Sequence, residues 1–194
     1  MQNKNRNNSQ QMLSPENYIR QKARTLPVYE CLINEIWKEA KMAHISVARK
    51  HSNSNITFCL YLVDLMCLGV KDSHFIFNVP LFEYKDKVKL MNERGHLEII
   101  DYVLAHNIIF AGLEFADDYG FSPHKDFTSV TMFMLEEDTD DIELMEIECG
   151  LNGMPAYMPG PYDDKIKINH TISQLEETAG PGNYVLLDQG DDMF

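Results

Sequence analysis

The longest apolar stretch of the chain covers residues 56–68, ITFCLYLVDLMCL, in which only Thr57 and Asp64 are not apolar. A run of this length, rich in aliphatic and aromatic residues and followed by Gly69, is typical of a strand that is buried on both faces. The pattern therefore predicts a protein with a substantial core, built around 56–68 as the central strand of a sheet.

Several shorter segments have the composition of strands and would extend this sheet. They are 28–33, 43–50, 75–79, 142–149 and 184–187. The polar turn 51–55 would join 43–50 to 56–68 as a hairpin. In 142–149, aliphatic residues alternate with glutamates, which predicts an amphipathic strand with 154–158 as its returning partner.

Two longer segments have the pattern of helices. Residues 96–119 are apolar on nearly every side, as in a core helix, and Gly120 follows where a left-handed C-cap residue would lie. Residues 163–179 would begin after a capping aspartate and end before a Gly-Pro-Gly sequence. Shorter helices are expected at 14–26, after a Ser-Pro-Glu start, and at 81–91.

Length and composition favour one folded unit. The chain has 194 residues, of which 44% are apolar, and it can therefore bury a sizeable core. We expect an α+β fold: an antiparallel sheet with 56–68 at its centre, covered by the helices 96–119 and 163–179. Residues 14–194 are expected to form a single domain, and the polar residues 1–13 a disordered tail.

The charge of the chain is strongly and unevenly negative. The formal net charge is -13, with +4 over residues 1–26 and therefore −17 over the remainder. An acidic body repels phosphate backbones and anionic lipid surfaces. No segment has the roughly eighteen consecutive apolar residues of a membrane-spanning helix. We therefore expect neither direct nucleic-acid binding nor membrane association.

One segment, 136–148, contains eight acidic residues and no basic one. A calcium site is one interpretation, but the alternating aspartates, the central glycine and the closing glutamate of an EF-hand loop are missing. A solvated acidic surface is the other interpretation. The glycine-rich phosphate-binding motifs and the motifs of serine hydrolases and zinc proteases are also missing. We therefore expect no metal ion and no cofactor.

The four cysteines are Cys31, Cys59, Cys67 and Cys149, and their spacing matches no metal site. Cys59 and Cys67 lie within the apolar run, where a cysteine behaves as a small hydrophobic residue. An extended strand would also hold them roughly 26 Å apart, beyond the reach of a disulfide. Reduced, buried thiols and an N-terminus without an apolar signal core are typical of a cytoplasmic protein.

Four polar residues are candidates for a catalytic site. His124 and Asp126 follow the expected core helix, and they could serve as a base with its orienting acid or as two metal ligands; alternatively they form a turn. His106 lies within that helix, either as a perturbed base or as a hydrogen-bonded core residue. Asp64 is a carboxylate in an apolar run, so it either lines a cleft or has a buried partner. We expect a partner: Lys71, His106 or a backbone amide.

The candidate binding residues lie in two loops rich in turn-forming residues. They are Pro123, His124, Lys125, Tyr157, Tyr162 and Asp163. Loops that a rigid scaffold positions often carry binding residues. A surface formed by the loop 121–126 and the hairpin 150–162 is therefore expected to contact a partner, which we expect to be a protein.

Three stretches together resemble a family of bacterial hypothetical proteins. They are YLVDLMCLGVKDS at 61–73, AHNIIFAGLEFADDYGFSPHKDF at 105–127, and GLNGMPAYMPGPYDD with TAGPGNY within 150–184. Some members of that family are joined to tetratricopeptide repeats or to a small zinc-binding module. The resemblance implies one folded unit from residue 14 onward, and it implies no catalytic residue.

Three functions are consistent with these observations. The first is a non-catalytic interaction or binding domain, which should expose an apolar patch. The second is a hydrolase-like enzyme that uses Asp64, His106, His124 and Asp126 in some combination, which requires a histidine within hydrogen-bond reach of an aspartate in one cleft. The third is an acidic mimic of nucleic acid, which requires a continuous acidic surface.

Overall fold

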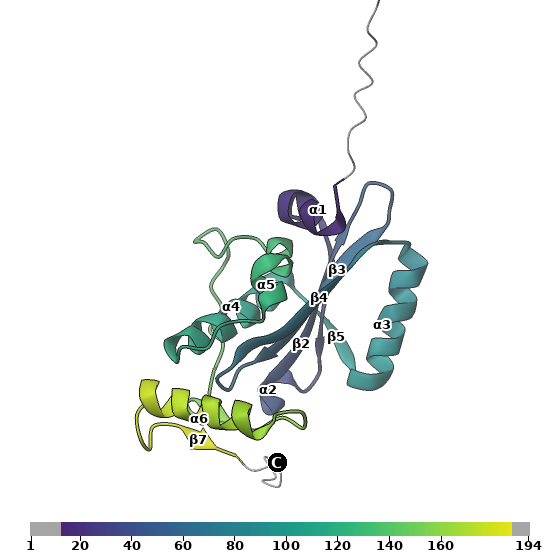
Figure 1. The fold of residues 1–194 in the computed structure, drawn as a ribbon. Helices are drawn as coiled ribbons and strands as arrows, with labels where there is room; N and C mark the ends of the chain where they lie inside the picture. Colours follow the sequence, from purple (N-terminus) through teal and green to yellow (C-terminus); the bar gives the residue numbers. More distant parts are fainter. Residues whose placement is uncertain (1–12, 188–194) are drawn as a thin grey trace, which may run out of the picture.

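The computed structural model describes residues 13–187, and its centre is a five-stranded antiparallel sheet (Figure 1). The strands follow the order β4-β3-β2-β1-β5. Their bounds are β1 Val28–Asn34, β2 Met42–Lys50, β3 Ile56–Asp64, β4 Gly69–Val79 and β5 Leu97–Ile100. Short connections join the first four strands, so each pairs with the strand before it, and β5 returns to pair with β1.

Helices flank the sheet on both sides, and the expected α+β class is confirmed. The described α-helices are α1 Pro15–Lys22, α2 Trp37–Ala40, α3 Leu81–Gly95, α4 Tyr102–Asp118, α5 Lys125–Ser129 and α6 Lys165–Thr178. Two 3₁₀ turns occupy Ala23–Thr25 and Thr131–Met134. Two short strands, β6 Ala156–Tyr157 and β7 Val185–Leu186, pair in parallel away from the main sheet.

One face of the sheet forms the main core with α4. Alternation along β2 and β3 directs Ile45, Val47 and Val63 to this side, where they are buried with Ile108 and Ile109 of α4. The helices α1 and α5 lie on the same side of the sheet (Figure 1). This face is therefore closed by several elements.

The buried guanidinium group of Arg49 joins three segments at this closed face. Arg49, near the end of β2, is 1% exposed. It donates hydrogen bonds to the carbonyl oxygens of Met134 at 2.8 Å and Leu26 at 2.7 Å, and it forms an ion pair of 2.7 Å with Glu136. The charge is thus buried with an anionic partner and several hydrogen bonds, as a buried charge requires.

The opposite face is covered by α3 at one end only. Phe58 and Ala48 pack there against Tyr84 of α3, whose ring centroid lies 5.0 Å from that of Phe58. Toward the other end of the same face, the side chains of His44 and His74 are exposed. The sheet therefore has one closed face and one half-open face.

The strand expected at 56–68 is shorter than its apolar pattern predicted. β3 ends at Asp64, residues 65–68 form a turn, and Gly69, with a φ of 63°, begins β4. The apolar residues of this turn are buried like those of the strand, which is why the pattern does not change at the boundary. β3 is an interior strand next to β2, which is the middle strand of the order.

The expectation of a partner for Asp64 is confirmed. The side chain is buried, and its carboxylate accepts hydrogen bonds from the backbone N–H groups of Met66 at 2.8 Å and Cys67 at 3.1 Å. Lys71 Nζ lies 3.6 Å from the second carboxylate oxygen. Asp64 therefore caps the turn that ends β3.

The expected helix 96–119 is a strand followed by a helix. Residues Leu97–Ile100 form β5, and α4 begins after Asp101. The Asp101 carboxylate accepts a hydrogen bond of 2.7 Å from the Val103 N–H, and its backbone is extended. This N-cap separates the two elements, because a helix cannot continue through an extended residue.

The expected helix 163–179 exists as α6, but it packs against the end of the sheet rather than over its face. Leu175 of α6 is buried with Cys67 of the β3–β4 turn and Tyr157 of β6. Gln174 and Thr178 donate hydrogen bonds to the Tyr119 carbonyl oxygen after α4. One end of the second face of the sheet is covered by α3 instead.

The prediction of an amphipathic strand at 142–149 is wrong, since these residues join no sheet. A side chain takes the place of a partner strand: the Asn107 amide of α4 donates to the Glu143 carbonyl and accepts from the Met145 N–H, at 3.0 and 2.8 Å. The returning strand expected at 154–158 is reduced to β6, which pairs with β7.

Other expectations agree with the structure. The strands expected at 28–33, 43–50, 75–79 and 184–187 correspond to β1, β2, β4 and β7, and β4 is longer because it begins at Gly69. The hairpin of β2 with β3 is confirmed. The expected disordered tail 1–13 lies outside the described residues, apart from Leu13.

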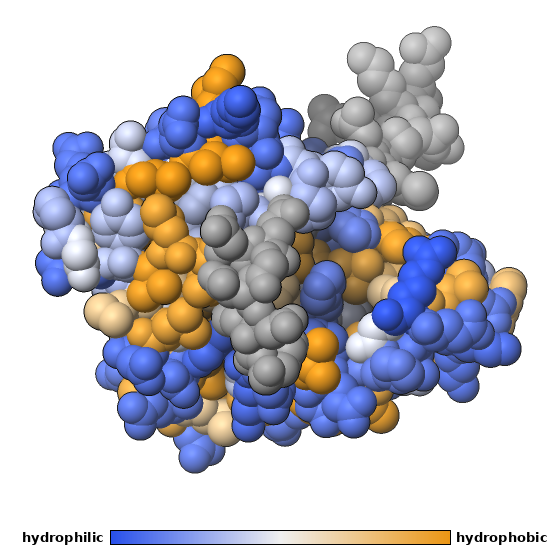
Figure 2. All heavy atoms as spheres, turned by 90° about the horizontal axis from the view of Figure 1, so that it is seen from below, coloured by the Kyte–Doolittle hydropathy of each residue, from blue (hydrophilic) through white to orange (hydrophobic). Residues whose placement is uncertain are grey.

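Apolar side chains gather in a band on the end of the molecule that α6 and β7 form (Figure 2). Exposed apolar residues of these elements include Ile166 and Leu186. None of the helices in the described part of the chain is long and apolar enough to cross a membrane.

Replacing Asp64 tests the cap of the β3–β4 turn. Asp64→Ala leaves the N–H groups of Met66 and Cys67 without their acceptor, so we expect the free energy of unfolding to fall by about 1–3 kcal/mol in urea titrations. Asp64→Asn keeps an acceptor oxygen and loses only the charge opposite Lys71, so it should cost less. Equal stability of all three proteins would contradict the role of the cap.

Replacing Gly112 tests the close approach of α4 to the sheet. A β-carbon there would lie 2.6 Å from Val63 Cγ1. Alanine gains about 1 kcal/mol in helix propensity, but the stiff valine cannot yield, so Gly112→Ala should destabilise by on the order of 1–3 kcal/mol. Adding Val63→Ala should recover part of the loss. Gly95→Ala is the control, because nothing lies within 4 Å of that position.

Candidate functional site

The open part of the second face carries two rows of side chains, whose order follows from the strand register. From β2 through β3 to β4, the rows read His44, Leu62, Asp72 and Ser46, Leu60, His74. Directly opposite residues of antiparallel strands point to the same side of the sheet. Two half-buried leucines therefore lie between polar side chains of the flanking strands.

These rows form the floor of a pocket of about 580 Å³. Its wall is the last turn of α3, where Met91, Arg94 and Gly95 line it, and Asn34 and Leu97 line it on the side of β1 and β5. The surface is hollowed on the side of α3 when the molecule is viewed from this end (Figure 2). The pocket exists because α3 packs on the sheet through its first half and leaves the two rows uncovered.

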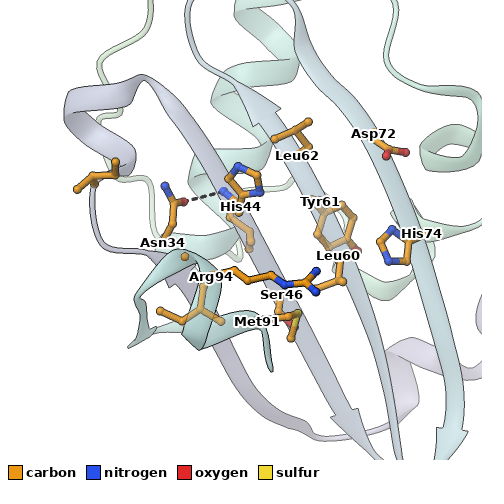
Figure 3. A pocket seen from close by; sticks show the side chains of 14 residues that line it. Asn34, His44, Ser46, Leu60, Tyr61, Leu62, Asp72, His74, Met91 and Arg94 are labelled. Atoms are coloured by element: carbon orange, nitrogen blue, oxygen red, sulfur yellow. Dashed lines mark hydrogen bonds between the residues drawn. The ribbon is translucent and has the colours of Figure 1, made fainter. Parts of the chain in front are cut away.

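Arg94 reaches from α3 into the pocket toward Ser46 and Leu60 (Figure 3). Its guanidinium group makes no hydrogen bond or ion pair with any residue between 13 and 187. The other arginines that the structure describes all donate to backbone carbonyl oxygens: Arg20, Arg24 and Arg49. The positive charge of Arg94 is therefore not paired with any described residue.

The hydroxyl group of Ser46, on the pocket floor, is not hydrogen-bonded to any described residue. The residue is 3% exposed, and its Oγ has no hydrogen-bond partner in the described part of the chain. Buried hydroxyl groups are nearly always hydrogen-bonded, because an unpaired one costs free energy. The Ser46 hydroxyl beside Arg94 is therefore free to form a hydrogen bond with a group inside the pocket.

Two histidines complete the polar rim, His44 on β2 and His74 on β4. Neither imidazole ring has a hydrogen-bond or ion-pair partner among residues 13–187. Loss of hydration lowers the pKa of His44, so its ring is neutral at pH 7. Its backbone N–H donates a hydrogen bond of 2.7 Å to Asn34, which fixes the start of β2 beside β1 (Figure 3).

The pocket has the groups for binding but not the geometry for nucleophilic catalysis. A serine nucleophile needs a base within hydrogen-bond reach. Ser46 and His74 share a row but lie on strands that β3 separates, so their backbones are roughly 10 Å apart. His44 and Ser46 also share no hydrogen bond, since Ser46 Oγ has no partner in the described chain. Ser46 therefore has no base hydrogen-bonded to it among the described residues.

The sequence-predicted catalytic residues do not meet in one site. Asp64 bonds to its own turn and to Lys71. His106 is buried in α4, stacked on Phe110 with ring centroids 4.3 Å apart, and its Nε2 lies 3.2 Å from the Glu136 carbonyl oxygen. Both residues therefore have partners in the core, and neither lines the pocket.

His124 and Asp126 act at the start of α5. His124 Nδ1 accepts a hydrogen bond of 3.4 Å from the Asp126 backbone N–H, and the His124 backbone N–H donates to Val70. Its ring also lies 3.8 Å from the Asp72 carboxylate. This contact joins the α5 loop to the pocket rim, but no hydrogen bond or ion pair links the Asp126 carboxylate to a histidine within residues 13–187.

The sequence-predicted binding residues have different surroundings. Tyr157 is buried, and its hydroxyl donates to Asp163, whose carboxylate also accepts from the Gly160 N–H and pairs with Lys167. These contacts build the loop before α6. Pro123 and Lys125 lie in the loop and first turn of α5, and Tyr162 is exposed. None of the six candidates lines the pocket.

Several carboxylates of the acidic segment 136–148 are attached to the body. Glu136 pairs with Arg49, Glu137 with Arg24 at 2.6 Å, and Glu148 with Lys41 at 3.3 Å. Asp138 Oδ1 lies 3.9 Å from the His106 ring. These ion pairs divide the segment, so it does not present all its acids as one free surface.

The described residues include no cluster of three or more His, Cys, Asp or Glu side chains arranged to hold a metal ion. The four cysteines are free thiols, and Cys59 and Cys67 are buried, as expected. Burial raises the pKa of Cys31 and Cys59 to about 12. These thiols are therefore protonated at neutral pH and are poor nucleophiles.

The pocket residues were not found by sequence reasoning. A signal exists in β2, because His44 and Ser46 alternate with the apolar residues Ala43, Ile45 and Val47, but in β4 the residue between Asp72 and His74 is the polar Ser73, so no alternation is visible there. The signal is incomplete, since only the register brings these strands together and only the placement of α3 shows which part of the face stays open. Arg94 lies on a helix and shares no pattern with them.

Comparison of the chain with protein-family models, with curated proteins and with solved structures found no match.

The buried His106 should make stability depend on pH. Burial lowers its pKa below the usual 6.5, although Glu136 and Asp138 oppose the shift. The unfolded chain then binds a proton more readily, so the stability is fully present above pH 6.5 and falls as the pH drops through 6.5 toward the lower folded-state pKa. Urea unfolding at about pH 7.5 and about pH 5.5 should show a smaller loss for His106→Gln than for the wild type.

The control for this experiment is His170→Gln, on an exposed position of α6. Loss of hydration also lowers the pKa values of His44 and His51, and both residues remain in every protein compared. An unchanged pH dependence in His106→Gln would contradict the assignment.

Proposed function

We propose that this chain is a non-catalytic binding domain that holds a small amphipathic organic molecule in the pocket between α3 and the open face of the sheet. One observation carries the proposal: unpartnered polar side chains, Arg94, Ser46, His44 and His74, converge around an apolar floor. Arg94, His44 and His74 are exposed, whereas Ser46 is buried, and a buried hydroxyl group without a hydrogen-bond partner is uncommon in proteins.

The size and chemistry of the pocket support this function. Sites for small molecules commonly enclose about 300–1,000 Å³, with mainly apolar walls and a few polar groups that set orientation. Leu60, Leu62 and Met91 supply the apolar surface, while Arg94 and the rim histidines supply the polar groups. Ser46 lies on β2 and His74 on β4, and β3 lies between these strands, so the histidine is not adjacent to the serine as its base would be. This favours binding without catalysis.

A protein partner is the second candidate. It is supported by apolar side chains exposed near α6 and β7, including Tyr162 at 98% and Ile166 at 80%. Single exposed apolar residues are common on protein surfaces, so this observation carries less weight than the pocket. We also propose that the protein is cytoplasmic and that it is related to the bacterial family that it resembles.

Binding of the neutral dye N-phenyl-1-naphthylamine, whose fluorescence rises in apolar surroundings, tests the pocket directly. We expect saturable binding of one dye per chain. Leu62→Trp places a large ring on the pocket floor, and it should weaken dye binding by about tenfold or more, because the ring occupies the apolar space.

The matched control is Leu90→Trp, the same substitution at an exposed position of α3 outside the pocket. It should leave dye binding unchanged, and circular dichroism verifies that both variants are folded. Absence of dye binding to the wild type, or equal binding to both variants, would refute the proposed function.

A further inference from the structure

We propose that the ligand of this pocket is a monocarboxylic acid, whose carboxylate binds Arg94 and Ser46 and whose apolar body lies on Leu60 and Leu62. This inference rests on the proposed function and adds the chemical class of the ligand.

Arg94 determines the sign of the ligand's charge. Its guanidinium group reaches into the pocket and has no acidic partner among residues 13–187. Every other arginine in that range is held by backbone carbonyl oxygens. A planar guanidinium matches the two oxygens of a carboxylate, and such charge-assisted pairs are stronger than neutral hydrogen bonds.

Ser46 adds a second, independent indication of the same position. Its hydroxyl is buried and has no partner in the described chain, and Arg94 points toward it (Figure 3). A hydroxyl group can donate one hydrogen bond. A carboxylate beside Arg94 would accept that bond and would remove the cost of the orphan group.

The net charge of the ligand is limited by the acidic group at the other end of the pocket floor. Asp72 lies at the β4 end of the row that begins with His44, so a second anionic group there would be repelled. The chain as a whole has a net charge of -13, which disfavours multiply charged anions. Arg94 is the single group in the described lining that is cationic at every ordinary pH. One positive charge suits a monoanion better than a phosphate, which carries about 1.5–2 charges at pH 7.

The apolar floor determines the rest of the ligand. Leu60 and Leu62 occupy the middle strand of both rows, between the polar ends, and Met91 of α3 faces them across the pocket. A short aliphatic or aromatic group attached to the carboxylate would bury its surface there. A small, fully polar acid would leave this surface unused.

Competition with the bound dye tests the inference. The probes are 4-phenylbutyrate and its uncharged amide, 4-phenylbutyramide, which differ only in the head group. In the wild type, we expect the acid to displace N-phenyl-1-naphthylamine at about a tenfold lower concentration than the amide, because the acid alone pairs with Arg94.

Variants of α3 assign that preference to one side chain. Arg94→Ala should remove the preference for the acid and leave displacement by the amide unchanged, and Arg94→Lys should keep part of it. Lys89→Ala, which removes one exposed positive charge from the same helix outside the pocket, is the control and should behave as the wild type. Phenyl phosphate should displace the dye less well than the carboxylate.

The outcomes separate this inference from the proposed function. Equal displacement by acid and amide, a preference that survives in Arg94→Ala, or stronger displacement by phenyl phosphate would overturn the monocarboxylate, while dye binding that depends on Leu62 would still support the pocket. Failure of the dye to bind would refute the proposed function itself.

Discussion

The ion pair between the buried Arg49 and the partly exposed Glu136 is the constraint on which the closed face of the sheet depends. Its guanidinium group bonds to the segment before β1, to the 3₁₀ turn after α5 and to the first residue of the acidic stretch. A cation in that position is tolerable only with these partners, because a buried charge without them costs several kcal/mol. The acidic stretch is therefore partly structural, since its first carboxylate neutralises the core of this face.

Arg49 and Arg94 differ in the same way as the two faces of the sheet, one closed and one carrying the pocket. Arg49 belongs to β2 and its side chain lies on the closed face of the sheet, whereas Arg94 belongs to α3 and reaches over the half-open face. Arg49 is enclosed and uses its donors within the protein, whereas Arg94 is exposed and has no partner among the described residues. The polar groups of the closed face stabilise the fold, and those of the open face are available to another molecule.

Local energetics made part of this structure predictable from the sequence. A carboxylate within an apolar run must have a partner, and Asp64 has several. The composition of 43–50 correctly predicted the strand β2, and the polar turn 51–55 correctly predicted its hairpin with β3. The end of β3 was not predictable, because the turn at 65–68 is as buried as the strand, and its burial depends on the distant helix α6.

The pocket depends on relations that no single segment contains. The cross-strand register brings β2 and β4 to either side of Leu60 and Leu62, and the length of α3 decides how much of the face it covers. The sequence-predicted site residues were chosen from polar positions in loops and in the core. The residues at the pocket instead belong to strands and to a helix end, where each alone resembles an ordinary surface position.

The alternation of residues along β2 has a consequence for how such a protein can evolve. Ile45 and Val47 belong to the core, while their neighbours His44 and Ser46 belong to the pocket on the other side. Substitutions at the second pair therefore need not disturb the packing of the first. Under the proposed function, changes at these alternate positions would alter ligand preference in descendants that keep the same fold.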